Sequence, residues 1–389
     1  MIVDSFGRYA VETIHDHGFL AGRSGWGGLG VFGEDLGVLL QFLLAVAQGE
    51  IDGHGGHLSS STVWDAGRVA IRTAFTDLFQ IDHPLVLAPM GGVSGGALAA
   101  AVSEAGGLGL VGGGYGDRGW LERELDTVAG ATDKPWGAGV ITWAASEDAV
   151  RLIVSYRPAA VFLSFGDPAP FGALVRQAGI RLICQVQDVT GARQAAAAGA
   201  DVIVAQGTEA GGHGSRRATL PLVPAVADAV APVPVLAAGG ITDGRGVAAA
   251  LMLGAQGAVV GTRFCATPEA LYPDWAKKQL VGGGGDETTR TRVFDIARGL
   301  DWPGPYTGRA LRNAFTDAWD GREEELRASA QAREQFALGH QAGDPDVGLV
   351  WAGEGTDLIT AVEPAGELVS QIAAQAEGLL AGASRQLDH

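Results

Sequence analysis

Eight short apolar runs constrain the fold of this chain more than any other feature of its sequence. They recur about every 25 residues and are continuous rather than alternating, as expected for parallel strands covered on both faces. Helix-like segments separate them. The runs are 85–88, 108–111, 136–141, 160–164, 182–186, 202–205, 235–238 and 258–261, and examples of the helix-like segments are 96–105, 120–129, 171–177, 190–198 and 244–253.

Eight evenly spaced units predict an α/β fold, a (β/α)8 TIM barrel over residues 76–270, with a doubly wound sheet as the main alternative. Residues 271–389 are richer in charge. Helical patterns at 322–333 and 367–380 predict that this region is helical and caps or flanks the barrel.

Residues 1–75 lack the βα alternation and form an N-terminal extension with no assigned function; a poorly ordered segment is one interpretation of it. Residues 35–48 are its one helix candidate. His54 and His57 lack a third ligand, so no metal site is predicted there.

Composition narrows the possible partners. The net charge is −17 and no dense Lys/Arg cluster is present, which argues against nucleic acid. Two cysteines, Cys184 and Cys265, are too few for a disulfide framework or a Cys-based metal site. The longest apolar stretch, 38–47, is far short of the roughly 20 residues of a membrane span. We therefore expect a cytoplasmic protein without a metal or a membrane partner; its oligomeric state is not predicted.

Glycines follow several of the predicted strands, at the end of a barrel where function resides. Gly91 and Gly92 follow the first run, where the absence of side chains lets a flat ligand lie against the backbone. Gly239-Gly240 and Gly261-Thr262 follow the seventh and eighth runs, where barrels often bind phosphate. These exits predict a phosphorylated cofactor, and flavin mononucleotide (FMN) fits because no metal-ligand set or nucleophile motif is apparent.

One histidine stands in a glycine-rich segment after the sixth run. His213 is the only histidine at a barrel strand exit, and imidazole suits proton transfer near neutral pH. Glu209 has two interpretations: it orients His213, or it caps or hydrogen-bonds its own loop. Cys265 follows the last run, where packing is favoured over lining the site.

Together these segments resemble the nitronate monooxygenase family, formerly called 2-nitropropane dioxygenases, over about residues 84–270. The segments are Ala205-Gln-Gly-Thr-Glu-Ala-Gly-Gly-His213, Leu236-Ala-Ala-Gly-Gly-Ile-Thr-Asp-Gly-Arg245, Leu253-Gly-Ala255 and Gly261-Thr-Arg-Phe264, with a looser match at Trp351-Ala-Gly-Glu-Gly355. The resemblance implies that Pro89, Met90 and Gly91 border the flavin of an FMN-binding barrel and that Gln206 hydrogen-bonds its ring. It also implies that the ribityl phosphate or its surroundings are held by Gly211, Gly212, Gly239, Gly240, Gly261 and Thr262.

The resemblance further implies FMN-dependent oxidation of alkyl nitronates by O2 to a carbonyl compound and nitrite. His213 falls on the family's active-site histidine, as a base or an electrostatic partner of the nitro group. Two departures stand out: Gly137-Ala-Gly139 replaces a Gly-x-Asn that is frequent in relatives, and the N-terminal extension matches nothing in the family.

Two other functions stay open. A related branch contains NAD(P)H-dependent FMN reductases of quinones or of an enoyl-acyl carrier protein, which more often have Glu at the position of Gln206. A non-catalytic barrel that only binds phosphate or flavin is the third hypothesis.

Overall fold

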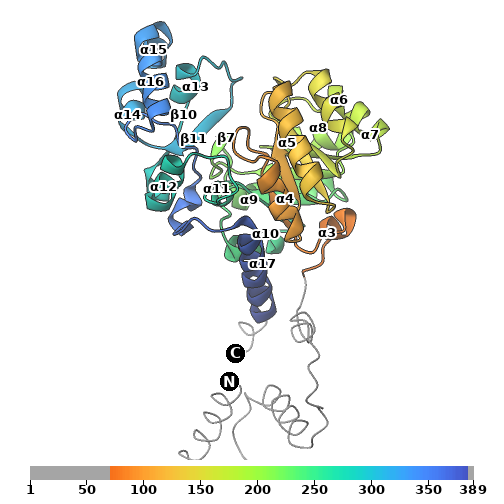
Figure 1. Cartoon of the computed structure of the whole chain (residues 1–389). Helices are drawn as coiled ribbons and strands as arrows, with labels where there is room; N and C mark the ends of the chain where they lie inside the picture. Colours follow the sequence, from red (N-terminus) through yellow and green to blue (C-terminus); the bar gives the residue numbers. More distant parts are fainter. Residues whose placement is uncertain (1–70, 384–389) are drawn as a thin grey trace, which may run out of the picture. The chain divides into compact units, whose positions relative to one another are not determined.

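The eight predicted runs form the eight parallel strands of a TIM barrel (Figure 1). The computed structural model describes residues 71–383, so the helix predicted at 35–48 and the His54–His57 pair lie outside the described residues. The strand order is β1-β9-β8-β6-β5-β4-β3-β2, and a parallel bridge between Val86 and Leu108 joins β1 to β2. The barrel strands are β1 (Leu85–Leu87), β2 (Gly109–Gly112), β3 (Trp136–Ile141), β4 (Ala160–Ser164), β5 (Arg181–Val186), β6 (Val202–Gln206), β8 (Val235–Ala238) and β9 (Ala258–Val260).

Alternate side chains along each strand build two cores. Val86, Phe162 and Val204 belong to a cluster with Phe75 and Phe79 of α3 (Ala74–Phe79). Thr73 Oγ1 and the Ala74 amide, at the start of α3, both bond Gln256 just before β9. Helix α3 therefore closes the barrel at the N-terminal ends of the strands, opposite the end where the site is expected.

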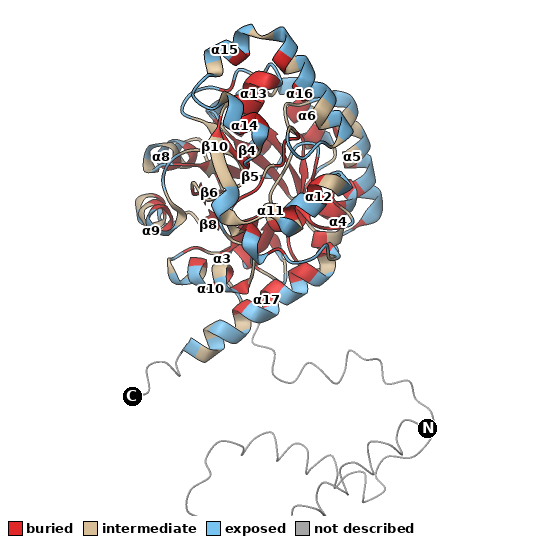
Figure 2. Ribbon diagram, turned by 90° about the vertical axis from the view of Figure 1, so that its left-hand side faces the viewer, coloured by how far each residue is buried: buried red, intermediate tan, exposed pale blue. Residues whose placement is uncertain are grey.

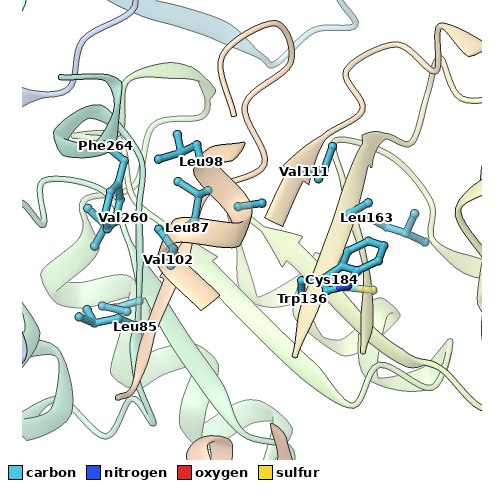
Figure 3. Close-up of a cluster of buried hydrophobic side chains, with 14 of the residues drawn as sticks. Leu85, Leu87, Leu98, Val102, Val111, Trp136, Leu163, Cys184, Val260 and Phe264 are labelled. Atoms are coloured by element: carbon cyan, nitrogen blue, oxygen red, sulfur yellow. The ribbon is translucent and has the colours of Figure 1, made fainter. Parts of the chain in front are cut away.

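The second core lies between the strands and the surrounding helices. Figure 3 shows Leu85, Leu87 and Val260 of the strands beside Leu98 and Val102 of α4. Buried residues concentrate on the strands and on the inward faces of the helices, whose outward faces are exposed (Figure 2). The helices that follow the strands are α4 (Gly96–Glu104), α5 (Arg118–Ala131), α6 (Glu147–Ser155), α7 (Ala169–Gln177), α8 (Val189–Ala197), α9 (Thr219–Val230), α10 (Gly244–Met252) and the short α11 (Thr262–Cys265).

A helix from the end of the described chain completes the helical layer. Helix α17 (Ala365–Gly382) packs against α10 and α4, and the Gly244 amide donates to Gln375 Oε1 at 2.7 Å. The helix predicted at 367–380 lies within α17. The division of the chain at residues 75 and 270 stays a prediction. The packing of α17 shows that residues near the end of the described chain belong to the helical layer around the barrel.

The packing of α17 gives a direct stability prediction. Leu368 is 1% exposed and Leu379, on the same helix, is 44% exposed. We expect Leu368→Ala to lower the free energy of unfolding by about 2–5 kcal/mol, because it leaves a cavity in the core. The matched change Leu379→Ala costs about 0.5 kcal/mol or less. Urea denaturation of both variants checks this, and equal losses would show that α17 does not pack as described.

The C-terminal region predicted to be helical contains strands as well as helices. β10 (Thr288–Thr291) and β11 (Thr307–Leu311) form an antiparallel sheet with β7 (Gly212–Gly214), in the order β10-β11-β7. This sheet forms because β11 pairs with a strand from a barrel loop, a contact that periodicity within the C-terminal segment does not reveal. The remaining elements are α12 (Asp274–Gly282), α13 (Val293–Ala297), α14 (Ala314–Trp319), α15 (Glu323–Ala328), α16 (Ala330–Ala342) and the 3-10 helices η1 (Gly285–Glu287) and η2 (Glu354–Leu358).

The single helix expected at 322–333 is two helices, α15 and α16. Ser329 separates them, because its side chain accepts a hydrogen bond from the Ala332 amide and so begins a new helix. Phe294, Phe315 and Phe336 give this part of the chain its own apolar cluster. Between residues 71 and 383, no helix has the length and apolar character needed to cross a membrane.

Candidate active site

A cavity of about 580 Å³ lies at the C-terminal ends of the barrel strands. This is the size range of small-molecule and cofactor sites. Inward-facing Phe162, Ala238 and Val259 line it together with the loops that follow the strands. The structure brings all eleven predicted site residues to this one lining: Pro89, Met90, Gly91, Gln206, Gly211, Gly212, His213, Gly239, Gly240, Gly261 and Thr262.

Three glycine-containing loops meet on one side of the cavity. A Cβ on Gly211 would lie 2.7 Å from both Thr262 Oγ1 and the Gly353 nitrogen, so only glycine allows this approach. The Gly353 amide donates to Thr262 Oγ1 at 3.1 Å. The loop at 351–355, the looser match of the sequence, thus lies against the exits of β6 and β9.

The exits of β8 and β9 offer free backbone donors. Gly240 has a φ of +71°, and within the described part of the chain no backbone carbonyl accepts from the N–H groups of Gly240 or Thr262. Neighbouring free N–H groups in such turns suit a phosphate oxygen. The residues present therefore fit the phosphate of a nucleotide cofactor.

The exit of β1 explains a departure noted in the sequence. A Cβ on Gly139 would lie 2.6 Å from Pro89 Cγ, so Pro89 fills the space that a side chain of β3 would need. An asparagine at this position is sterically excluded in this chain. Gly91 approaches Gly114 as closely, since its Cβ would lie 2.8 Å from the Gly114 Cα.

Gln206 is fixed at the end of β6 by two hydrogen bonds. Gln187 Nε2 donates to Gln206 Oε1 at 2.9 Å, and Gln206 Nε2 donates to the carbonyl oxygen of His213 at 3.0 Å. The amide orientation follows from this chain of donors and acceptors, and it leaves one N–H of Gln206 without a partner among these groups.

His213 lies on β7 and is paired with a buried carboxylate. Its Nε2 is 3.0 Å from Asp295 Oδ1 and 2.9 Å from Asp295 Oδ2, and the two side chains are 9% and 2% exposed. Because a carboxylate only accepts, the proton of the neutral imidazole sits on Nε2. Nδ1 then carries a lone pair, so this histidine can accept a proton.

Burial lowers the pKa of His213 below its ordinary value of 6.5. The Asp295 carboxylate opposes that shift, and the nearby guanidinium groups of Arg298 and Arg290 add to it. The imidazole is therefore neutral at neutral pH.

Aromatic rings surround His213 in the cavity lining. Trp302 stacks on the imidazole with 3.4 Å between ring centroids and 7° between planes. The centroids of Trp351 and Phe165 are 5.1 Å and 6.3 Å from that of His213. Asp295, Trp302 and Trp351 come from beyond the barrel strands, and sequence reasoning did not assign them to the site; only the looser 351–355 match gave a signal for Trp351.

Glu209 and the cysteines have structural roles. Glu209 accepts hydrogen bonds from the backbone N and Oγ1 of Thr219, so it holds the start of α9, while Asp295 is the partner of His213. Of the two interpretations of Glu209, the contacts therefore support a capping or hydrogen-bonding role and not the orientation of His213. Burial raises the pKa of Cys265 and of Cys184 to about 12. Cys265 lies 3.5 Å from Met90 Sδ as a neutral thiol in the wall of the cavity.

Comparison with known proteins agrees with the fold and with the resemblance. The sequence model of the family described as nitronate monooxygenase matches residues 72–149 and 142–375. A nitronate monooxygenase of Neurospora crassa is 34% identical over 343 residues, 76% of this chain and 89% of that protein. A (3aS,4S,5R,7aS)-5-hydroxy-7a-methyl-1-oxo-octahydro-1H-indene-4-carboxyl-CoA dehydrogenase of Mycobacterium tuberculosis is 38% identical over 228 residues, 58% of this chain and 64% of that enzyme.

Solved structures show the same architecture. FabK from Thermotoga maritima superposes with a TM-score of 0.72 at 32% identity, over 81% of this chain and 99% of that one. Nitroalkane oxidase from Streptomyces ansochromogenes superposes with a TM-score of 0.70 at 30% identity, over 80% of this chain and 100% of that one.

Proposed function

Because the chain belongs to the nitronate monooxygenase family of oxidoreductases, we propose that it oxidises alkyl nitronates with O2 to a carbonyl compound and nitrite, using FMN. The observation that carries this proposal is the buried His213–Asp295 pair in the wall of a glycine-lined cavity. Nitrite release and O2 consumption with a small alkyl nitronate test it in the steady state.

The cavity supplies groups that suit FMN. The free N–H groups of Gly240 and Thr262 would hold its phosphate, and Met90 and Gln206 would border its ring. When bound, FMN would supply the redox chemistry of the reaction.

His213 serves the reaction through Nδ1. Asp295 keeps the proton on Nε2, so Nδ1 can take the acidic proton at the carbon of a neutral nitroalkane. The resulting imidazolium is stabilised by the Asp295 carboxylate and lies beside the negative charge that the substrate has gained. With a preformed nitronate the proton transfer is not needed, and the remaining role of His213 is electrostatic.

The alternative function is NAD(P)H-dependent FMN reduction of quinones or an enoyl-acyl carrier protein. The similarity to the dehydrogenase of M. tuberculosis and to FabK favours it. The related reductases more often have Glu at the position of Gln206, so this residue favours the monooxygenase. NADH or NADPH oxidation with a quinone acceptor, measured beside nitrite release, separates the two.

The cofactor site can be tested at two glycines with the same backbone. Gly212 and Gly179 have φ values of +69° and +72°, and a Cβ on either would meet no atom within 4 Å. Only Gly212 lines the cavity. We expect Gly212→Ala to raise the Kd for FMN about tenfold, the equivalent of about 1.4 kcal/mol, because the methyl group takes up cavity space.

Gly179→Ala is the matched control for this change. Both substitutions place a Cβ on a left-handed residue, at a cost of about 1–2 kcal/mol in stability. Titration of the apoprotein with FMN, followed by the quenching of flavin fluorescence, should show a weaker site only in Gly212→Ala. Equal affinities in both variants would place the cofactor elsewhere.

The proposal also predicts a pH dependence. His213 is an active base only when neutral, and its pKa lies below 6.5. The ratio kcat/KM for a neutral nitroalkane should therefore be constant above pH 6.5 and fall as the pH drops through the lowered pKa of His213. A midpoint above pH 6.5, or activity that rises on acidification, would contradict the assignment.

A further inference from the structure

Phe165 has an unusual backbone conformation at the end of β4. Its φ is +61°, and among residues 71–383 only Gln80 and Arg157 are other non-glycine residues with positive φ. Those two follow the ends of α3 and α6, where left-handed residues are common. Phe165 follows a strand instead, and an aromatic residue in this region costs free energy that the surrounding structure must compensate.

The left-handed turn places the Phe165 ring between other aromatic rings. Its centroid is 5.2 Å from that of Trp302 and 5.3 Å from that of Tyr306, both in edge-to-face contacts. His213 lies 6.3 Å away, so the ring stands beside the candidate base. The strained backbone thus serves to hold one ring at the wall of the main cavity.

A second cavity, of about 610 Å³, lies at the exits of β4 and β5 beside α8, and Tyr306, which contacts the Phe165 ring, is part of its lining. Ser164 and Phe165 line the main cavity, whereas their neighbours Leu163 and Gly166 line the second. Gln185 belongs to both linings. The two spaces therefore adjoin at the exits of β4 and β5, where the Phe165 ring in the lining of the main cavity contacts the Tyr306 ring in the lining of the second.

The far side has apolar surface that an alkyl chain can use. Leu163, Val186, Ala195 and Tyr306 contribute this surface to the lining of the second cavity, beside polar side chains that include Asp167, Gln187 and Asp188. An alkyl group that enters this space leaves water, and each buried methylene gains about 0.8 kcal/mol, the equivalent of about fourfold in affinity.

We propose that Phe165 is the partition that limits the length of the substrate's carbon chain. This inference rests on the function proposed above and names short-chain alkyl nitronates as the substrate class. The ring ends the space available to the substrate beside His213, and the second cavity is the space that a longer chain enters when the ring is removed.

The test uses the FMN-loaded protein and straight-chain carboxylates from acetate to octanoate. Their planar anionic heads resemble a nitronate but are not oxidised. Isothermal titration calorimetry should show affinity that stops rising at a short chain in the wild type. In Phe165→Gly, where glycine takes the φ of +61° without strain, affinity should keep rising about fourfold per added methylene. Phe165→Ala should behave similarly.

Two further variants keep the test specific. Phe165→Tyr retains the ring and should keep the short limit. Arg157→Gly changes another left-handed residue that lines neither cavity, so its profile should match the wild type. An unchanged limit in Phe165→Gly would overturn the partition.

A parallel series of alkyl nitronates separates this proposal from the function on which it rests. Turnover of nitronates with an unshifted chain-length limit in Phe165→Gly would refute the partition alone. A shifted carboxylate limit, with no nitronate oxidised by any variant, would support the partition and refute the proposed function.

Discussion

His213→Asn is expected to bind FMN normally and to lose about 10²–10⁴-fold in kcat/KM for neutral nitroalkanes. Asparagine has no group that takes a proton near neutral pH, whereas Nδ1 of His213 carries a free lone pair. Preformed nitronates need no deprotonation, so the loss with them should be much smaller. Steady-state nitrite release from the two forms of one nitroalkane measures the difference.

A second histidine provides the control. His340 lies outside the cavity lining and accepts a hydrogen bond from the Leu349 amide through Nδ1, a contact that an asparagine oxygen can replace. His340→Asn should leave both activities unchanged. Equal losses with nitroalkane and nitronate in His213→Asn would rule out the base and leave the electrostatic role.

Asp295→Asn is expected to lower kcat/KM for neutral nitroalkanes by about 10²–10⁴-fold, although Asp295 itself transfers no proton. An amide at this position can donate to Nε2, which moves the imidazole proton to Nδ1 and removes the lone pair. The variant keeps the shape of the buried pair. Its loss should therefore approach that of His213→Asn.

The pH profile distinguishes this role from a structural one. The carboxylate raises the pKa of His213 against the effect of burial, so its removal should move the acid limb of the residual activity to lower pH. Asp317→Asn, at an exposed ion pair with Arg312, removes a charge of the same sign and should leave the profile in place. Full activity in Asp295→Asn would contradict the assigned pair.

The barrel was predictable because its signals are local. Each strand is a run of consecutive apolar residues, as in 160–164 and 235–238, and such a run indicates a strand that is buried on both faces. The glycine exits were predictable for the same reason, since Gly211 and Gly240 mark close approaches and left-handed turns within short segments. His213 was found because it stands among such glycines.

The rest of the site depends on contacts between distant segments. β7 has the sequence Gly-His-Gly, which carries no strand pattern, and it is a strand because His213 pairs with Gly308 of β11. The segment between β10 and β11 contains Asp295 of α13 and the loop with Trp302. The pairing of β11 with β7 therefore accompanies the contact of both side chains with the imidazole. No local pattern in the sequence singles out Asp295 from the other carboxylates of the C-terminal segment.

Anaerobic mixing of the FMN-loaded protein with a small alkyl nitronate tests the central claim most directly. NADH and NADPH are mixed with the same protein in parallel, and the flavin absorbance is followed in each case. The proposed function predicts that the nitronate reduces the flavin while both nicotinamides leave its spectrum unchanged. Fast bleaching by NADH or NADPH, with the nitronate inert, would contradict it and assign the chain to the reductases.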